Sequence, residues 1–285
     1  MKKSLLAAAL MAAFGTSVLA APITADVVAI VDESGSMSGE HAWLAGMMSS
    51  LDTGLNAAGL TGNRYGLVGF GGGSVHYTGH QHDVGGVGNQ FGTAAEFGTA
   101  TSTLVLSGGT EDGYSGINTA NGYSYRAGAA RNYILVTDED RDNVDSSLTY
   151  TSILTSLTGT GTLLNAVVDA TFRCGNATGS VLGIDDNGTG YIADGAGGYT
   201  TASGCSAATG DGTTIADYVN LALASGGAAW NLNLLRAGGV TAQSFTNAFV
   251  DIKVKEITNV PEPASLALAG LALLGLGAGR LRRQR

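Results

Sequence analysis

The chain has 285 residues, of which only 13% are charged, and its 45 glycines show no collagen-like period. Six of the 14 basic residues and one of the 23 acidic residues lie in two terminal segments, so residues 21–259 carry 8 basic and 22 acidic residues, a net charge of −14. This acidity argues against nucleic acid and anionic membrane surfaces as partners, because both attract Lys and Arg. The roughly 240 residues between the terminal segments are enough for one sizeable core.

Residues 1–20 have the layout of an export signal. Lys2 and Lys3 precede an apolar stretch from Leu5 to Phe14, and small residues follow up to Ala20. Cleavage after Ala20 is expected, because cleavage one residue later would place Pro22 directly after the scissile bond. The alternative, a buried or membrane helix, is disfavoured by the short length and the terminal position.

Strand and helix patterns alternate through the first half of the remaining chain. Short apolar runs predict strands, and apolar residues at helical spacing predict helices. The expected strands are 27–31, 65–70 and 75–78, the last pairing antiparallel across the turn at 71–73. The expected helices are 41–58, a weak one at 93–104, and 113–120.

The second half continues the alternation, with one interruption. Strands are expected at 132–136 and 163–172, helices at 145–157, 213–224 and 242–249, and an extended segment at 230–235. The Gly-rich stretch 173–212 contains both cysteines and is expected to be a surface excursion. Because an exported chain meets an oxidising compartment, we expect Cys174 and Cys205 to form a disulfide, which suits them better than a metal site. Together the elements predict an α/β fold with a mainly parallel sheet.

Oxygen-bearing side chains follow the first and fourth of these strands. Asp32, Ser34 and Ser36 come directly after 27–31, Thr137-Asp138 follow 132–136, and Thr110 lies in a loop between them. Ligands of parallel sheets bind beyond the carboxyl ends of the strands, and oxygen ligands suit a hard cation such as Mg²⁺. Taken alone, Asp32-x-Ser34-x-Ser36 is equally consistent with a helix cap.

The order and spacing of these three segments resemble the von Willebrand factor type A (VWA) domain over residues 26–257. Ile134-Leu135-Val136-Thr137-Asp138 and Ser225-Gly226-Gly227 add to the resemblance. It implies a Rossmann-like three-layer fold over residues 21–259, with one antiparallel edge strand and helices on both faces. It also implies a metal-ion-dependent adhesion site (MIDAS), where Ser34 and Ser36 bind Mg²⁺ directly, Asp32 and Asp138 act through water, and Thr110 does either. Mn²⁺ and Ca²⁺ are alternative ions. A carboxylate from a partner would complete the coordination.

Several residues depart from that pattern or suggest other chemistry. Glu139 replaces a glycine of the family within Asp138-Glu139-Asp140-Arg141-Asp142, and Glu111-Asp112 follow Thr110; we expect these extra acidic residues to form a solvated rim, with a second cation as the alternative. His76, His80 and His82 are expected to be polar surface residues rather than a metal site. Asp185-Asp186-Asn187-Gly188 lacks the later ligands of a calcium loop. No nucleophile elbow, zinc-protease motif or phosphate-binding loop occurs, so an enzyme is not expected.

The C-terminus has three parts. Val260-Pro261-Glu262-Pro263 leads into 16 uncharged residues, 264–279, and four arginines follow. An α-helix of this length spans about 24 Å, short of a bilayer core, so it is a marginal permanent anchor. The layout resembles the PEP-CTERM sorting signal of Gram-negative bacteria, which implies a precursor tethered in the inner membrane, processing by an exosortase, and a mature protein at the cell surface or in the matrix. An ordinary single-span anchor is the alternative.

The sequence therefore predicts an exported binding or adhesion protein that recognises a protein or matrix ligand through a Mg²⁺ site. Two alternatives stay open. One is a structural matrix component whose metal serves only stability, and the other is an accessory subunit of an exported complex.

Overall fold

The computed structural model of the protein describes residues 24–175 and 179–259. The predicted export signal, the residues Val260–Pro263 and the segment 264–279 lie outside the described residues.

The centre of the fold is a nine-stranded sheet in the order β3-β2-β1-β4-β5-β11-β7-β8-β9. Its five inner strands β2, β1, β4, β5 and β11 run parallel, and β3 pairs antiparallel with β2 at one edge. The strands are β1 (Ala25–Asp32), β2 (Arg64–Phe70), β3 (His80–His82), β4 (Ala130–Thr137), β5 (Leu163–Val168), β7 (Val181–Asp185), β8 (Gly190–Ala193), β9 (Tyr199–Ala202) and β11 (Ala228–Asn231). The predicted α/β fold, with a mainly parallel sheet and an antiparallel edge strand, is confirmed.

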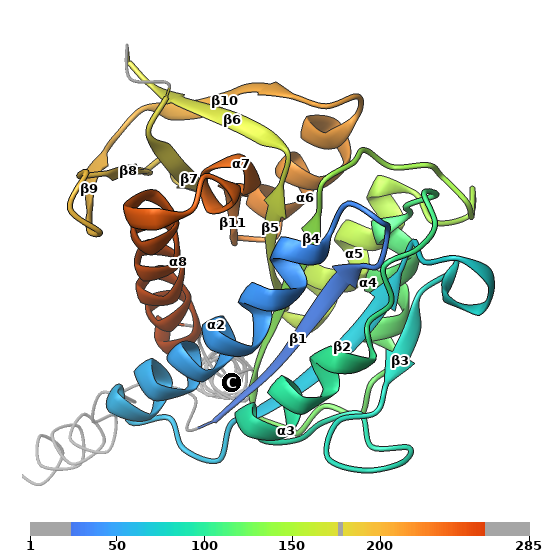
Figure 1. Cartoon of the computed structure of the whole chain (residues 1–285). Helices are drawn as coiled ribbons and strands as arrows, with labels where there is room; N and C mark the ends of the chain where they lie inside the picture. The colour runs from blue at the N-terminus through green and yellow to red at the C-terminus, as the bar shows by residue number, and fades with distance from the viewer. Residues whose placement is uncertain (1–23, 176–178, 260–285) are drawn as a thin grey trace, which may run out of the picture.

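Helices cover both faces of the sheet (Figure 1). One face packs against α2 (Ser38–Ala57), α3 (Ala94–Ala100) and α8 (Gly239–Asn259), and the other against α4 (Gly113–Asn121), α5 (Tyr150–Thr160) and α6 (Asn220–Ala224). Side chains of β1 alternate between these two cores, because successive residues of a strand point to opposite faces. Val27, Ala29 and Val31 belong to the first core, and Val28 and Ile30 to the second.

Three predicted elements have different bounds in the structure. Residues 74–76 form a 3₁₀ turn, and the antiparallel strand lies at His80–His82 instead of 75–78. The helix expected from residue 145 begins at Tyr150, because Thr149 and Ser152 form a reciprocal capping box there. The expected helix 93–104 ends at Ala100 and continues as a 3₁₀ turn, Thr101–Thr103.

The predicted strand 163–172 is two strands. The chain turns at Asp169, whose carboxylate accepts a hydrogen bond from Asn233 Nδ2 at 2.5 Å. Beyond it, β6 (Ala170–Cys174) leaves the main sheet and pairs antiparallel with β10 (Cys205–Gly210). The segment expected to be extended between residues 230 and 235 is also divided, into β11 and the short helix α7 (Leu232–Arg236).

Residues 173–212 are more regular than the predicted surface excursion. Their strands β7, β8 and β9 extend the main sheet with antiparallel pairs beyond β11. Most of β7 is buried, so this segment contributes to the core. The sequence interpretation was wrong here because glycines needed at the tight turns masked the short strands between them.

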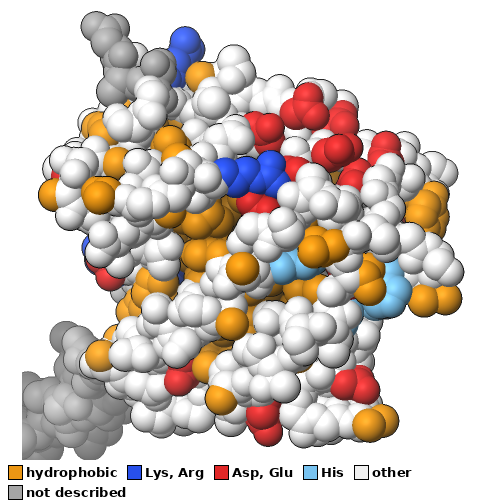
Figure 2. All heavy atoms as spheres, viewed as in Figure 1, with side chains coloured by type: hydrophobic (Ala, Val, Ile, Leu, Met, Phe, Trp, Pro, Cys, Tyr) orange, Lys and Arg blue, Asp and Glu red, His pale blue; other side chains and the backbone are white. Residues whose placement is uncertain are grey.

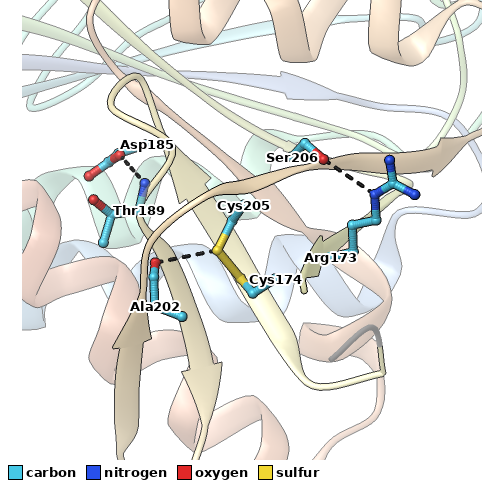
Figure 3. The surroundings of a disulfide bond; sticks show 7 residues. All are labelled: Arg173, Cys174, Asp185, Thr189, Ala202, Cys205 and Ser206. Atoms are coloured by element: carbon cyan, nitrogen blue, oxygen red, sulfur yellow. Dashed lines mark hydrogen bonds between the residues drawn. A yellow bond between two sulfur atoms is a disulfide. The ribbon is translucent and has the colours of Figure 1, made fainter. Parts of the chain in front are cut away.

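The predicted disulfide between Cys174 and Cys205 is present and joins β6 to β10 (Figure 3). Gly190 of β8 packs against this bond, and a Cβ at that position would collide with both sulfur atoms. The neighbouring residues Asp185–Gly188 form a tight turn in which Asp185 Oδ1 accepts hydrogen bonds from the backbone amides of Asn187 and Thr189. The turn explains this aspartate-rich stretch without a bound ion.

Candidate metal centre

The carboxyl ends of β1 and β4 lie side by side and bring Asp32 close to Thr137. Asp32 is the last residue of β1 and is fully buried. Its Oδ1 accepts a hydrogen bond from the Ser34 amide at 2.7 Å, and its Oδ2 accepts one from Thr137 Oγ1 at 2.9 Å. Both carboxylate oxygens are thereby fixed in orientation.

The two serines extend this arrangement toward Asp138. Ser34 Oγ lies 3.1 Å from Ser36 Oγ, and Ser36 Oγ donates a hydrogen bond to Asp138 Oδ1 at 3.0 Å. Ser34 is buried, whereas Ser36 is exposed, so the group opens to solvent at Ser36. Four of the five predicted ligands therefore form one connected group, which begins inside the fold and ends at its surface.

Thr110, the fifth predicted ligand, lies in the loop before α4 and is half-buried. Among the described residues, no direct hydrogen bond joins it to the other four. The structure does place its neighbour Glu111 against Asp32: a Cβ on Gly71 would lie 2.9 Å from Asp32 Oδ1 and 3.0 Å from Glu111 Cγ. The loop containing Thr110 thus reaches the same edge of the sheet.

The burial of Glu111 contradicts the expectation that it belongs to a solvated acidic rim. It is fully buried, and neither of its carboxylate oxygens has a hydrogen-bond partner among the described residues. Burial, followed by the nearby charges of Asp32 and Glu139, raises its pKa to about 8. Burial likewise raises the pKa of Asp32 to about 7. In their charged form, two buried carboxylates side by side are costly unless a cation compensates them, so these residues fit a divalent metal ion.

The other acidic residues of this region have structural partners or are exposed. Asp112 is buried, caps α4 through the Tyr114 amide, and forms an ion pair with Arg141 Nε at 2.7 Å. Asp142 accepts a hydrogen bond from the Glu111 amide. Glu139 and Asp142 are exposed, as a rim requires, whereas Glu111 and Asp112 are not. Figure 2 shows the acidic side chains gathered on this face with a basic side chain beside them.

Arg236 was not among the predicted site residues. This residue ends α7, and its guanidinium lies 2.8 Å from Asp138 Oδ2 and 2.6 Å from Glu40 Oε1. It therefore lowers the negative charge at the exposed end of the group. Its position could not be predicted, because residues 230–235 were expected to be extended, and an extended segment gives no reason to place Arg236 at the strand ends.

The expectation that the three histidines are polar surface residues is also wrong. His82 is buried, His76 and His80 are half-buried, and all three converge on the buried carboxylate of Glu33. Glu33 directly follows Asp32, so this second group of side chains adjoins the first.

Residues 259–283 match the PEP-CTERM protein-sorting motif. The chain carries a PEP-CTERM sorting signal. This confirms the prediction from Val260-Pro261-Glu262-Pro263, and it marks a secreted protein that is anchored in the membrane before processing by an exosortase. No helix among the described residues has the length and apolar character to cross a bilayer. No curated protein sequence matches the chain.

Similar solved structures include VWA domains. Proximal thread matrix protein 1 from the mussel byssus, with a zinc-occupied MIDAS motif, is 16% identical over 52% of this chain and 36% of its own, with a TM-score of 0.38. The von Willebrand factor type A protein from Catenulispora acidiphila is 22% identical over 51% and 33%, with a TM-score of 0.34. BatB from Bacteroides thetaiotaomicron is 13% identical over 81% and 98%, with a TM-score of 0.46. The chain spans about a third of the length of the first two.

Proposed function

We propose that the protein is a metal-dependent binding module of the VWA type, exported to the cell surface or matrix, where it recognises a protein or matrix ligand. The observation that carries the proposal is the connected group Asp32, Ser34, Ser36 and Asp138 at the carboxyl edge of the sheet. The sorting signal supports an extracellular setting.

In this proposal Ser34 and Ser36 hold Mg²⁺ through their hydroxyls, with Asp32, Asp138 and Thr110 completing the site. When bound, the ion supplies a coordination position for a carboxylate of the partner. The chain's own residues prepare the site: Thr137 orients Asp32, and Ser36 places the opening at the surface. Arg236 reduces the negative charge of Asp138, which lowers repulsion of an acidic ligand. We assign no catalytic role to these residues.

The test is binding of the full chain to cells and to matrix polysaccharide or protein, with Mg²⁺ and with a chelator. We expect Ser36→Ala to weaken Mg²⁺-dependent binding by roughly 10- to 100-fold, because it removes a ligand at the exposed end. Ser38→Ala is the matched control, since Ser38 is an exposed serine two residues away. Binding that is unchanged by Ser36→Ala or by the chelator would contradict the mechanism.

One observation favours a second candidate, a structural matrix component whose metal serves the fold. The unpartnered carboxylate of Glu111 is buried, so an ion near it would stabilise the folded state even without a partner. A large Mg²⁺-dependent rise in the melting temperature, combined with no metal-dependent ligand, would favour this candidate.

A further inference from the structure

A second group of side chains, distinct from the proposed Mg²⁺ ligands, has the composition of a transition-metal site. It consists of Glu33 after β1, His76 in the 3₁₀ turn, and His80 and His82 on β3. One donor atom from each residue lies within 4.8 Å of all the others. Figure 2 shows histidine side chains reaching the surface on this face.

The three imidazoles surround one buried carboxylate. His76 Nδ1 and His80 Nε2 each lie 3.0 Å from Glu33 Oε2, and His82 Nε2 lies 3.3 Å from Glu33 Oε1. The side chain of Glu33 is fully buried, and that of His82 is only 5% exposed. The backbone also fixes the orientation of the Glu33 side chain, because its Oε1 accepts a hydrogen bond from the Val105 amide at 2.8 Å.

The hydrogen bonds of His82 determine which of its ring nitrogens carries a proton. His82 Nδ1 lies 2.6 Å from Thr103 Oγ1, and the Thr103 hydroxyl donates its own hydrogen to the Ala100 carbonyl at 2.8 Å. Thr103 Oγ1 must therefore accept from His82 Nδ1. In the neutral ring, Nε2 then carries a lone pair that faces Glu33, and this buried atom has no hydrogen-bond partner within residues 24–175 and 179–259.

The same reasoning applies to His80. Its Nδ1 lies 2.9 Å from the Thr78 carbonyl oxygen, which can only accept, so Nδ1 carries the proton. His80 Nε2 is also buried, 3.0 Å from Glu33 Oε2, and in the neutral ring it has no hydrogen-bond partner among the described residues. If both rings are neutral, two lone pairs face a carboxylate, which is repulsive; a cation among them, or a second proton on each ring, removes this repulsion.

The surrounding hydrogen bonds and the donor spacing match those of zinc sites. Metal-bound histidines usually donate their second ring N–H to a carbonyl, hydroxyl or carboxylate oxygen, as His80 and His82 do here. Zinc bonds of 2.0–2.1 Å in a tetrahedron separate the donor atoms by about 3.4 Å. The histidine nitrogens lie 3.0–3.3 Å from the two Glu33 oxygens, and one donor atom from each of the four residues lies within 4.8 Å of the others. Gly69 leaves the room for this group, because a Cβ there would collide with Glu33 Oε2 and His82 Nε2.

We propose that Glu33, His76, His80 and His82 bind a transition-metal ion of the Zn²⁺ class. Four protein ligands complete a tetrahedron, which is typical of a structural site. The ion would fix the chain between β2 and β3 to the end of β1, beside Asp32. His76 and His80 are about a quarter exposed, which leaves a path for the ion from solvent.

The test is Zn²⁺ binding by the metal-stripped full chain in excess Mg²⁺. We expect one tightly bound Zn²⁺ per chain, and we expect His82→Gln and His80→Gln each to weaken it by roughly 100-fold or more. His41→Gln is the matched control, since His41 is the chain's fourth histidine and lies outside the cluster. Zinc bound equally by wild type and His82→Gln would overturn the proposal.

X-ray absorption of the zinc-loaded wild type makes the test independent of how the variants fold. Three imidazole nitrogens in the first coordination shell are expected, and two or fewer would overturn the proposal. Ser36→Ala separates this site from the proposed Mg²⁺ site, because it should keep full zinc affinity. Loss of Mg²⁺-dependent binding and loss of the zinc site are therefore distinguishable.

Discussion

Asp26 lies at the opposite end of β1 from Asp32, and its environment is the reverse. Both carboxylates are fully buried, but Asp26 is paired with Arg64 Nη2 at 2.6 Å and with Arg126 Nη2 at 2.5 Å. Burial alone would raise the pKa of Asp26, yet the hydrogen bonds from the two arginines outweigh burial and hold its pKa below the ordinary 3.8. The carboxylate at the Asp26 end of β1 is thus paired with two arginines, whereas among the described residues Asp32 has no such ion pair.

We expect Asp26→Asn to destabilise the fold by about 2–4 kcal/mol at pH 7. The estimate is below that for fully buried pairs, because both arginines are about a third exposed. Since the pKa of Asp26 is lowered, its contribution is complete above pH 3.8 and is lost as the pH falls through the folded-state pKa. Urea unfolding at several pH values measures this. An equal wild-type and variant stability at pH 7 would contradict it.

Residues of the candidate sites differ in how far the sequence could reveal them. Asp32, Ser34 and Ser36 are contiguous, and Asp138 follows an obvious strand, so local pattern and strand order sufficed to bring them together. Glu111 and the three histidines could not be assigned correctly, because their burial depends on contacts between distant segments. A charged or imidazole side chain in a Gly-rich loop gives no local sign of being enclosed.

Ser225-Gly226-Gly227, between α6 and β11, is a motif that the backbone packing requires. Ser225 Oγ accepts a hydrogen bond from the Leu164 amide at 2.9 Å, and Gly226 has a φ of +86°. Gly227 approaches the Leu164 carbonyl oxygen so closely that a Cβ would overlap it. The motif therefore fixes the entry of β11 beside β5.

We expect Gly227→Ala to destabilise the protein by about 1–3 kcal/mol, because the new methyl group collides with backbone atoms of β5. Gly46→Ala is the matched control: Gly46 lies within α2, nothing lies within 4 Å of a Cβ there, and alanine should be neutral or stabilising by about 0.5–1 kcal/mol. Thermal unfolding of both variants decides the matter. Equal effects of the two substitutions would show that the close approach is unimportant.

Elements with strong periodicity were predictable, and short ones were not. The apolar spacing of α2 and the uninterrupted run of β1 identified both, whereas β7, β8 and β9 each contain only four or five residues between glycine turns. The helix α7 was missed because its start depends on a cap from the Asn231 side chain, which accepts a hydrogen bond from the Asn233 amide.

Over the whole molecule, a well-packed sheet supports one edge at which buried negative charge collects. Asp32, Glu33 and Glu111 all lie there within a few residues of the ends of β1 and of the loop before α4. The histidines contact Glu33, and Arg236 forms an ion pair with Asp138 at the same edge. The sorting signal marks the chain as a secreted protein.

If the edge formed by Asp32, Ser34, Ser36 and Asp138 binds a divalent ion, calorimetric titration of the metal-stripped full chain with Mg²⁺ will detect it. We expect one bound Mg²⁺ per wild-type chain, roughly 10- to 100-fold weaker binding by Ser36→Ala, and unchanged binding by Ser38→Ala. A folded wild-type protein that binds no Mg²⁺, or a Ser36→Ala variant that binds Mg²⁺ as tightly as the wild type, would show that these residues do not form the metal site.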